Sequence, residues 1–395
     1  MKKFNKVLSV VVASAMVMAM AGCGNTDNGS AATGTNAATE SAAADNGAAS
    51  GSVFKIGGIG PTTGGAAVYG LAVQHGAEIA VEEINAAGGI NGYQVEFKFQ
   101  DDEADAEKSV NAYNALKDWG AQIIDGSTTS GACIAVTDKT KEDNMFQITP
   151  SGSAVECVQY DNNFRVCFSN PNQGLASAQY IGENGLAEKI AVIYDSSDVY
   201  SSGIYEKFVK EAENQPFEVV AAEAFTADNK TDFSVQLQKA KDAGADMVFL
   251  PIYYQESALI LTQAAAMGYA PKWFSCDGMD GILGGVDNFD VSLTEGVMLL
   301  TPFAADATDD LTQSFVTKYK EKYGDTPNQF AADSYDAIYV IKAAIEKSGV
   351  TPDMSVSDIC DGMKAAMTEI TVDGLTGNGM TWTCLLYTSD AADDL

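Results

Sequence analysis

Side chains able to hold a charged small molecule recur at the ends of the strands that the sequence predicts. They supply hydroxyl groups, amides at helix starts, one carboxylate and several aromatic rings, and they are Tyr69, residues 127–131, Ser151, Gly152, Ser153, Tyr200, Tyr253 and Asp277. Hydroxyls and helix-start amides suit an anion, the Asp277 carboxylate suits a cation, and the rings suit an apolar group. A free α-amino acid carries all three features, so the pattern predicts an amino acid as the ligand.

Each of these residues also has an ordinary structural role. Residues 127–130 could cap a helix, because serine and threonine favour that position. Tyr69 or Tyr253 could lie at the edge of a core, and Asp277 within Cys-Asp-Gly could belong to a turn. Their joint occurrence at successive strand ends favours the binding role.

The composition excludes several other kinds of site. The 395 residues include 54 acidic and 23 basic side chains, which gives a net charge of −31. A surface this negative repels phosphate backbones, so we expect no nucleic-acid partner. The single histidine, His75, excludes multi-histidine metal sites and disfavours Ser-His or Cys-His catalysis; it lies off the apolar face of its helix, and we expect it on the surface. We therefore expect no enzyme activity, no cofactor and no metal.

Short apolar runs alternate with helical patterns from residue 53 onward. The strands are expected at residues 53–59, 93–99, 122–125, 145–149, 189–194, 217–222, 246–250, 272–276 and 296–300. Helices are expected at residues 69–87, 105–119, 201–213, 232–243 and 255–267. Repeated βα units predict parallel sheets with helices on both faces, and such sheets bind ligands beyond the carboxyl ends of their strands.

Breaks in this pattern divide the body into two lobes. Turn-forming residues interrupt it at 169–174 (SNPNQG), and further breaks lie near Thr301 and at 377–380. We assign residues 53–170 and 301–378 to lobe 1, residues 171–300 to lobe 2, and residues 379–383 to the start of a return to lobe 2. Two doubly wound α/β lobes joined by a three-segment hinge predict a clamshell.

The N-terminal residues have the pattern of an export signal. Residues 1–22 combine a lysine-containing start with an apolar run that is too short for a comfortable transmembrane helix, as in a secretory signal peptide. The run ends in Met-Ala-Gly-Cys, which resembles a bacterial lipobox and implies a lipid on Cys23; a plain signal peptide is the alternative. Residues 24–52 contain no aromatic or large aliphatic side chain, so residues 23–52 form the lipidated cysteine and a flexible Gly/Ala/Ser/Thr/Asn tether.

The last residues, 384–395, read CLLYTSDAADDL. They resemble translated adapter sequence and follow no pattern that the preceding domain needs, so we expect a non-native tail. A genuine short acidic tail is the alternative.

Several stretches are similar to the periplasmic-binding-protein type I family, and most closely to its branched-chain amino acid members, which serve ABC transporters. They are FKIGGIGPTTGGAAVYG, GAEIAVEEINAAGGINGYQVEFKFQDDEAD, ITPSGSA, DFSVQLQKAKDAGADMVFL and GLTGNGMTW. The resemblance implies a clamshell that binds an amino acid between its lobes. It also implies partners, namely the permease subunits of an ABC importer.

The resemblance also implies roles for individual residues. The carboxylate-binding serine of the family corresponds to Ser130, and the acid that pairs with the ligand ammonium corresponds to Asp277. The turn that contacts the zwitterion corresponds to Ser151, Gly152 and Ser153. The second-lobe tyrosine falls on Tyr200, and the side-chain pocket on Tyr69, Tyr253 and Phe330. Close relatives have Ala-Ala-Thr in the turn and many have glutamate in place of Asp277, so the sequence departs from them at both places.

Five cysteines remain apart from Cys23 and Cys384: Cys133, Cys157, Cys167, Cys276 and Cys360. Cys157 and Cys167 could bridge a short hairpin, because exported proteins permit disulfides. Free buried thiols would fit equally well.

With the resemblance, the sequence predicts a monomeric, lipid-anchored, extracytoplasmic solute-binding protein that carries a branched-chain or other aliphatic amino acid to an ABC permease. A same-fold binder or sensor for amides, aromatic acids or small peptides is the alternative. A surface hydrolase is disfavoured because a nucleophile–base set is missing.

Overall fold

The computed structural model describes residues 51–383, and it contains two five-stranded sheets. The first sheet has the order β2-β1-β3-β4-β5, and its strands are β1 (Phe54–Gly60), β2 (Val95–Asp101), β3 (Ile123–Asp125), β4 (Phe146–Thr149) and β5 (Asn163–Arg165). Strands β3 and β4 are buried along their whole length. Apolar runs of this kind are typical of parallel strands covered on both faces.

The second sheet has the order β10-β9-β8-β6-β7. Its strands are β6 (Lys189–Asp195), β7 (Glu218–Phe225), β8 (Met247–Leu250), β9 (Lys272–Ser275) and β10 (Met298–Leu299). Every strand pair in both sheets is parallel, which confirms the predicted fold class.

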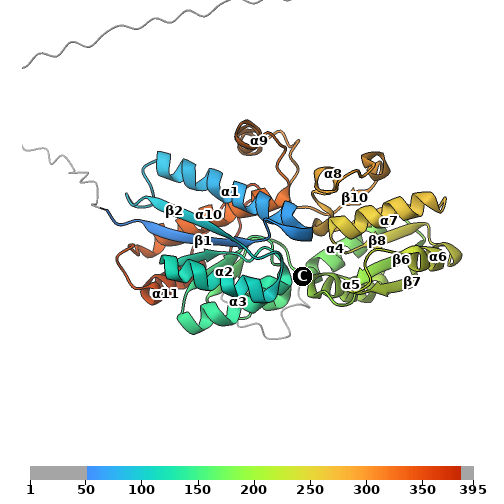
Figure 1. The fold of residues 1–395 in the computed structure, drawn as a ribbon, viewed down its shortest axis with the longest axis horizontal. Helices are drawn as coiled ribbons and strands as arrows, with labels where there is room; N and C mark the ends of the chain where they lie inside the picture. The colour runs from blue at the N-terminus through green and yellow to red at the C-terminus, as the bar shows by residue number, and fades with distance from the viewer. Residues whose placement is uncertain (1–50, 384–395) are drawn as a thin grey trace, which may run out of the picture. The chain divides into compact units, whose positions relative to one another are not determined.

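Helices cover both sheets (Figure 1). Around the first sheet lie α1 (Ala67–Ala86), α2 (Ala106–Trp119), α3 (Ser130–Asp143), α10 (Gln329–Ser348) and α11 (Val356–Met367). Around the second lie α4 (Asn170–Glu183), α5 (Val199–Ala212), α6 (Ser234–Asp242) and α7 (Tyr254–Ala266). The remaining helices are α8 (Ile282–Gly285), α9 (Asp310–Tyr323), and the short 3-10 turns η1 (Gly64–Ala66), η2 (Val155–Val158), η3 (Asp277–Met279) and η4 (Val291–Thr294).

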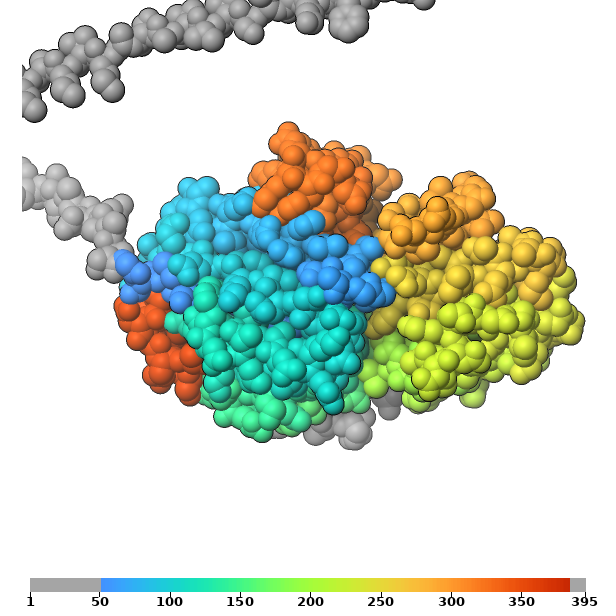
Figure 2. Space-filling model, viewed as in Figure 1, coloured from blue at the N-terminus to red at the C-terminus, as the bar shows by residue number. Residues whose placement is uncertain are grey.

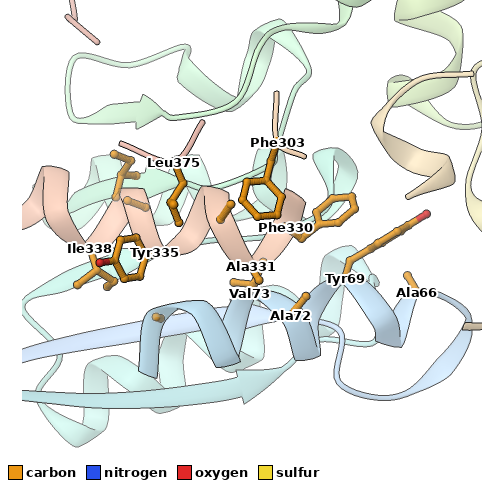
Figure 3. Close-up of a cluster of buried hydrophobic side chains, with 14 of the residues drawn as sticks. Ala66, Tyr69, Ala72, Val73, Phe303, Phe330, Ala331, Tyr335, Ile338 and Leu375 are labelled. Carbon is orange, nitrogen blue, oxygen red and sulfur yellow. The ribbon is translucent and has the colours of Figure 1, made fainter. Parts of the chain in front are cut away.

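One glycine in each half allows a close helix pair. A Cβ atom at Gly76 in α1 would lie 2.0 Å from the carbonyl oxygen of Ala331 in α10, and one at Gly174 in α4 would lie 2.4 Å from that of Ile204 in α5. The side chains of α1 and α10 form a continuous apolar layer (Figure 3). Tyr69 belongs to this layer, which continues beyond it to Ala66, so packing of the core fixes the position of the Tyr69 ring.

The segment 169–174 is the start of a helix, so the expected interruption by turns is wrong there. The Ser169 hydroxyl accepts a hydrogen bond from the Asn172 N–H (3.3 Å), and Pro171 lies in the first turn of α4. Proline and serine serve helix starts as well as turns. The chain therefore passes from β5 into α4, which packs on α5 of the second half.

The expectation that His75 lies on the surface is wrong. His75 is half-buried and not on the open surface, because its ring stacks on Tyr323 of α9 with 3.6 Å between ring centroids. Burial lowers the pKa of His75.

The five cysteines within the described residues are buried and free, so Cys157 and Cys167 are not bridged.

The expectations for the chain ends lie outside the described residues. They concern residues 1–22, Cys23, most of the tether and the tail at 384–395. Among the helices within residues 51–383, none has the length and apolar character needed to cross a membrane.

Candidate ligand-binding site

A cavity of about 10 Å³ is lined by residues that follow strands of both sheets. Seven predicted residues line it, and they are Tyr69, Ser130, Ser151, Tyr200, Tyr253, Asp277 and Phe330. Gly152 and Ser153 lie in the adjoining turn but not on the cavity wall. Thr128 and Thr129, which belong to the predicted stretch 127–131, and Gly278, which was not predicted, complete the lining. Figure 2 shows the two halves meeting along a seam between the blue-to-teal surface and the green-to-yellow surface.

The hydroxyl of Ser130 is oriented by the turn that faces it. Its oxygen accepts hydrogen bonds from the N–H groups of Ser153 and Ala154, both at 3.1 Å. A serine hydroxyl has two acceptor positions and one proton. Both acceptor positions are filled, so the proton remains for a group in the cavity, and an anion is the group that it would bind.

Helix capping does not account for Ser130. Thr129 is the N-cap residue of α3, its side chain makes no capping hydrogen bond, and Ser130 is the first helical residue. The first N–H groups of a helix have no partner within it and attract negative charge. The start of α3 therefore adds donors on the same side of the cavity as Ser130.

The turn at residues 151–154 is held by hydrogen bonds to Thr128 and Thr149. The Ser151 hydroxyl donates to the Thr128 carbonyl (2.7 Å), and the Gly152 N–H donates to the Thr149 hydroxyl (2.8 Å). A Cβ atom at residue 152 would lie 2.7 Å from that hydroxyl, so glycine suits this position.

Arg165, the one arginine of the chain, holds the turn from behind. Its Nη1 donates to the carbonyl oxygens of Ser153 (2.9 Å) and Ala154 (3.0 Å). The N–H groups of these two residues bind Ser130, so one guanidinium fixes the residues that orient the serine. The sequence offered no signal for this role beyond the rarity of arginine.

Asp277 supplies a buried carboxylate from the second half, and its side of the cavity is prearranged as well. Oδ1 accepts from the Tyr200 hydroxyl (2.6 Å) and Oδ2 from the Gln173 amide (3.0 Å). Burial raises the pKa of Asp277 to about 6, although the hydrogen bonds from Tyr200 and Gln173 act to lower it. At neutral pH the carboxylate is mostly ionised and suits a cation. Gln173 was not predicted, because the segment 169–174 was expected to form turns and not the first turn of α4.

Tyr69 connects the two halves across the cavity. Its hydroxyl donates to the Gly278 carbonyl and accepts from the Tyr254 N–H (3.2 Å). Its ring lies 4.3 Å from that of Phe330 and 5.5 Å from that of Tyr253, centroid to centroid. These rings form the apolar wall of the cavity.

The cavity has room for about one water molecule in this arrangement. A larger cavity of about 290 Å³ shares Thr129 and Tyr253 with it. An amino acid can therefore enter only if the two halves separate or the rings turn aside.

A family match decides what kind of protein this geometry belongs to. The family described as periplasmic binding protein matches residues 53–384. The chain belongs to the periplasmic binding protein family. Members are extracytoplasmic solute-binding proteins of ABC transporters, and they are not enzymes.

Individual members of this family are similar over most of their length. The Leu/Ile/Val-binding protein homolog 3 of Brucella melitensis is 31% identical over 300 residues, which are 75% of this chain and 80% of that protein. The leucine-, isoleucine-, valine-, threonine- and alanine-binding protein of Pseudomonas aeruginosa is 30% identical over 303 residues, 75% of this chain and 79% of that protein.

A solved structure agrees with this assignment. The branched-chain amino acid substrate-binding protein LivJ of Streptococcus pneumoniae, in complex with isoleucine, is 28% identical. It aligns with a TM-score of 0.72 over 82% of this chain and 91% of its own.

Proposed function

We propose that this periplasmic binding protein captures a free α-amino acid in the Ser130–Asp277 cavity and delivers it to an ABC permease. Branched-chain amino acids are the first candidates, because the similar proteins are named for binding them. The observation that carries the proposal is the placement of an anion-binding hydroxyl and an ionisable acid on opposite halves of one cavity.

The ligand carboxylate would bind on the side of the first sheet. The Ser130 hydroxyl proton and the N–H groups at the start of α3 would donate to it. The residues at 151–153 would contact the same end of the zwitterion. Neutral donors suffice there, because the helix start contributes a partial positive charge.

The ligand ammonium would bind Asp277 on the side of the second sheet. The hydrogen bonds from Tyr200 and Gln173 hold this carboxylate in place before the ligand arrives, which reduces the ordering cost of binding. Tyr69, Tyr253 and Phe330 would enclose the side chain. An amide or an aromatic acid without an ammonium group would leave the buried Asp277 carboxylate with its hydrogen bonds but without a cation, so the geometry favours an amino acid over these ligands.

Closure of the two halves would be the signal that the permease reads. A ligand that binds groups of both halves stabilises the closed arrangement by its differential affinity for it. The lobes would comprise residues 53–170 with 301–378, and residues 171–300. Residues 379–383 would begin the return to lobe 2.

The chain would be held at the membrane by a lipid on Cys23 and act as a monomer. The support is the lipobox-like Met20-Ala21-Gly22-Cys23 after an apolar run. Expression of the full chain and of Cys23→Ala with a radiolabelled fatty acid tests this. Label on the parent alone is expected, and equal labelling of both would contradict the anchor.

The ligand itself can be identified by mass spectrometry. Protein purified from its producing cells is denatured, and the released small molecules are compared with those from a sample of the Asp277→Ala variant. We expect a free amino acid that the variant lacks. A ligand without an α-ammonium group would contradict the proposal.

A further inference from the structure

The start of α10 lies against the loop that carries Asp277. Phe330, in its first turn, lines the cavity, and the Gln329 N–H donates to Oδ2 of Asp280 (2.8 Å), three residues after Asp277. Figure 3 shows Phe330 beside Tyr69, at the ends of α10 and α1. The first turns of α10 therefore form the wall behind the aromatic rings.

Two polar side chains in this wall have no hydrogen-bond partner among residues 51–383. Gln329 and Asp333 are both 0% exposed, and neither amide atom of Gln329 and neither carboxylate oxygen of Asp333 has a hydrogen bond. More than nine in ten buried polar groups in proteins are paired. Gln329 and Asp333 are four residues apart and lie on one side of α10, and Phe330 is one turn from Asp333, so the three residues are neighbours on the helix.

The titratable groups that act on Asp333 are acids and a thiol. They are Asp336 on the same helix, Asp277 and Asp280 on the loop after β9, and Cys167 after β5. Burial, with the charges of the three acids, raises the pKa of Asp333 well above its usual range. A positive or hydrogen-bond-donating group is what this site would stabilise.

We propose that Asp333 and Gln329 form a second polar subsite, behind Phe330, which binds an N–H or O–H donor at the end of the ligand side chain. This inference rests on the proposed amino acid function and narrows it. An aliphatic side chain would leave both groups unpaired in the closed protein, whereas a hydroxyl, amide or ammonium end would pair them. Turning the Phe330 ring aside opens the path from the cavity.

Matched ligands provide the test, because each pair differs mainly in the donor. Ligand-stripped protein is titrated calorimetrically with threonine against valine, glutamine against methionine, and ornithine against norleucine. In at least one pair we expect the donor-bearing member to bind at least tenfold more tightly. In Asp333→Leu this preference should vanish, while the apolar member binds as well or better.

The pairs also separate this inference from the function on which it rests. If aliphatic amino acids bind but no pair shows the preference, or Asp333→Leu leaves it unchanged, the subsite is wrong and the function stands. If no amino acid binds, both are wrong.

A second measurement uses the milder variant Asp333→Asn, which retains a hydrogen-bonding side chain. This variant keeps the inference testable if Asp333→Leu does not fold. An ammonium that pairs with Asp333 favours the ionised form of this carboxyl. Across a series of pH values, binding of ornithine should therefore release protons in the parent protein wherever Asp333 is protonated, measured as a binding enthalpy that differs between phosphate and Tris buffers. Asp333→Asn should release less; equal proton release by both proteins would overturn the pairing.

Discussion

The Tyr200 hydroxyl donates a 2.6 Å hydrogen bond to Oδ1 of Asp277 and accepts one from the Gly278 N–H at 2.9 Å. The tyrosine thus uses both its donor and an acceptor position on the loop that carries the acid. Asp277 is held by its own half of the protein, independently of any ligand. Its carboxylate therefore has a fixed position at which an ammonium group can bind.

Replacement of Asp277 by alanine should weaken amino acid binding by at least about 2 kcal/mol, or roughly 30-fold, because a buried ammonium loses its partner. Titration of leucine or isoleucine into the variant measures this. Asp287→Ala, at an exposed position in the same half, is the matched control and should bind as the parent does. Unchanged affinity in Asp277→Ala would refute the assignment of this residue.

Replacement of Tyr200 by phenylalanine should have a smaller effect. It removes one hydrogen bond to the carboxylate, so we expect a loss of about 1 kcal/mol in binding free energy. The hydrogen bond from Tyr200 lowers the pKa of Asp277, so the variant should also need a higher pH to reach full affinity. A pH profile identical to that of the parent would show that the hydroxyl does not act on the acid.

Affinity for the amino acid should depend on pH in a defined direction. Burial raises the pKa of Asp277 to about 6, so the ligand-free protein holds this proton at pH values where an unfolded chain has lost it. The ammonium needs the ionised form. Affinity should therefore be nearly constant above pH 7 and fall by up to about tenfold per unit below pH 6. Asp277→Asn should flatten this dependence, and a profile that still falls in that variant would point to another acid.

Arg165 should act on the carboxylate end of the ligand without touching it. Arg165→Met removes both hydrogen bonds to the 153–154 peptides, and we expect roughly tenfold weaker binding of leucine, with a partial loss in Arg165→Lys. The diagnostic readout is the preference for leucine over leucinamide, which should shrink in Arg165→Met. A variant that loses stability but keeps this preference would show a purely structural role.

Gly76 should be essential for the packing of α1 on α10. Gly76→Ala places a methyl group 2.0 Å from the Ala331 carbonyl oxygen, and we expect a destabilisation of about 1–3 kcal/mol. Gly131→Ala in α3 meets no atom within 4 Å and should be neutral or stabilising by up to about 1 kcal/mol. Urea unfolding of both variants measures the difference. Equal stability of the two would mean that the helices can separate at no cost.

Local patterns in the sequence predicted every strand of residues 51–383 except β5, but among the α-helices they predicted only α1, α2, α5, α6 and α7. The period of two in residues 93–99 indicated β2, and the end of α1 was expected within one residue of Ala86. The prediction for residues 296–300 was too long, because only Met298 and Leu299 pair with β9. The apolar residues at 296–300 reflect partial burial, and partial burial does not indicate at which residue the hydrogen bonding between two strands ends.

The side chains that support the site were harder to predict. Strand ends indicated Ser130 and Asp277, because parallel strands bring their carboxyl ends to one edge. Gln173 lies 104 residues from Asp277, and its contact depends on how α4 packs in three dimensions. The same is true of the Tyr69 contact with Gly278 across 209 residues. Such pairings follow from tertiary packing, which has no local period in the sequence.

A free amino acid is proposed to bind in the cavity between Ser130 and Asp277. Calorimetric titration of ligand-stripped protein with each of the common amino acids tests it most directly. The account predicts saturable binding, one ligand per chain, for at least one of them, and loss of that binding in Asp277→Ala. The absence of binding for every amino acid would contradict it.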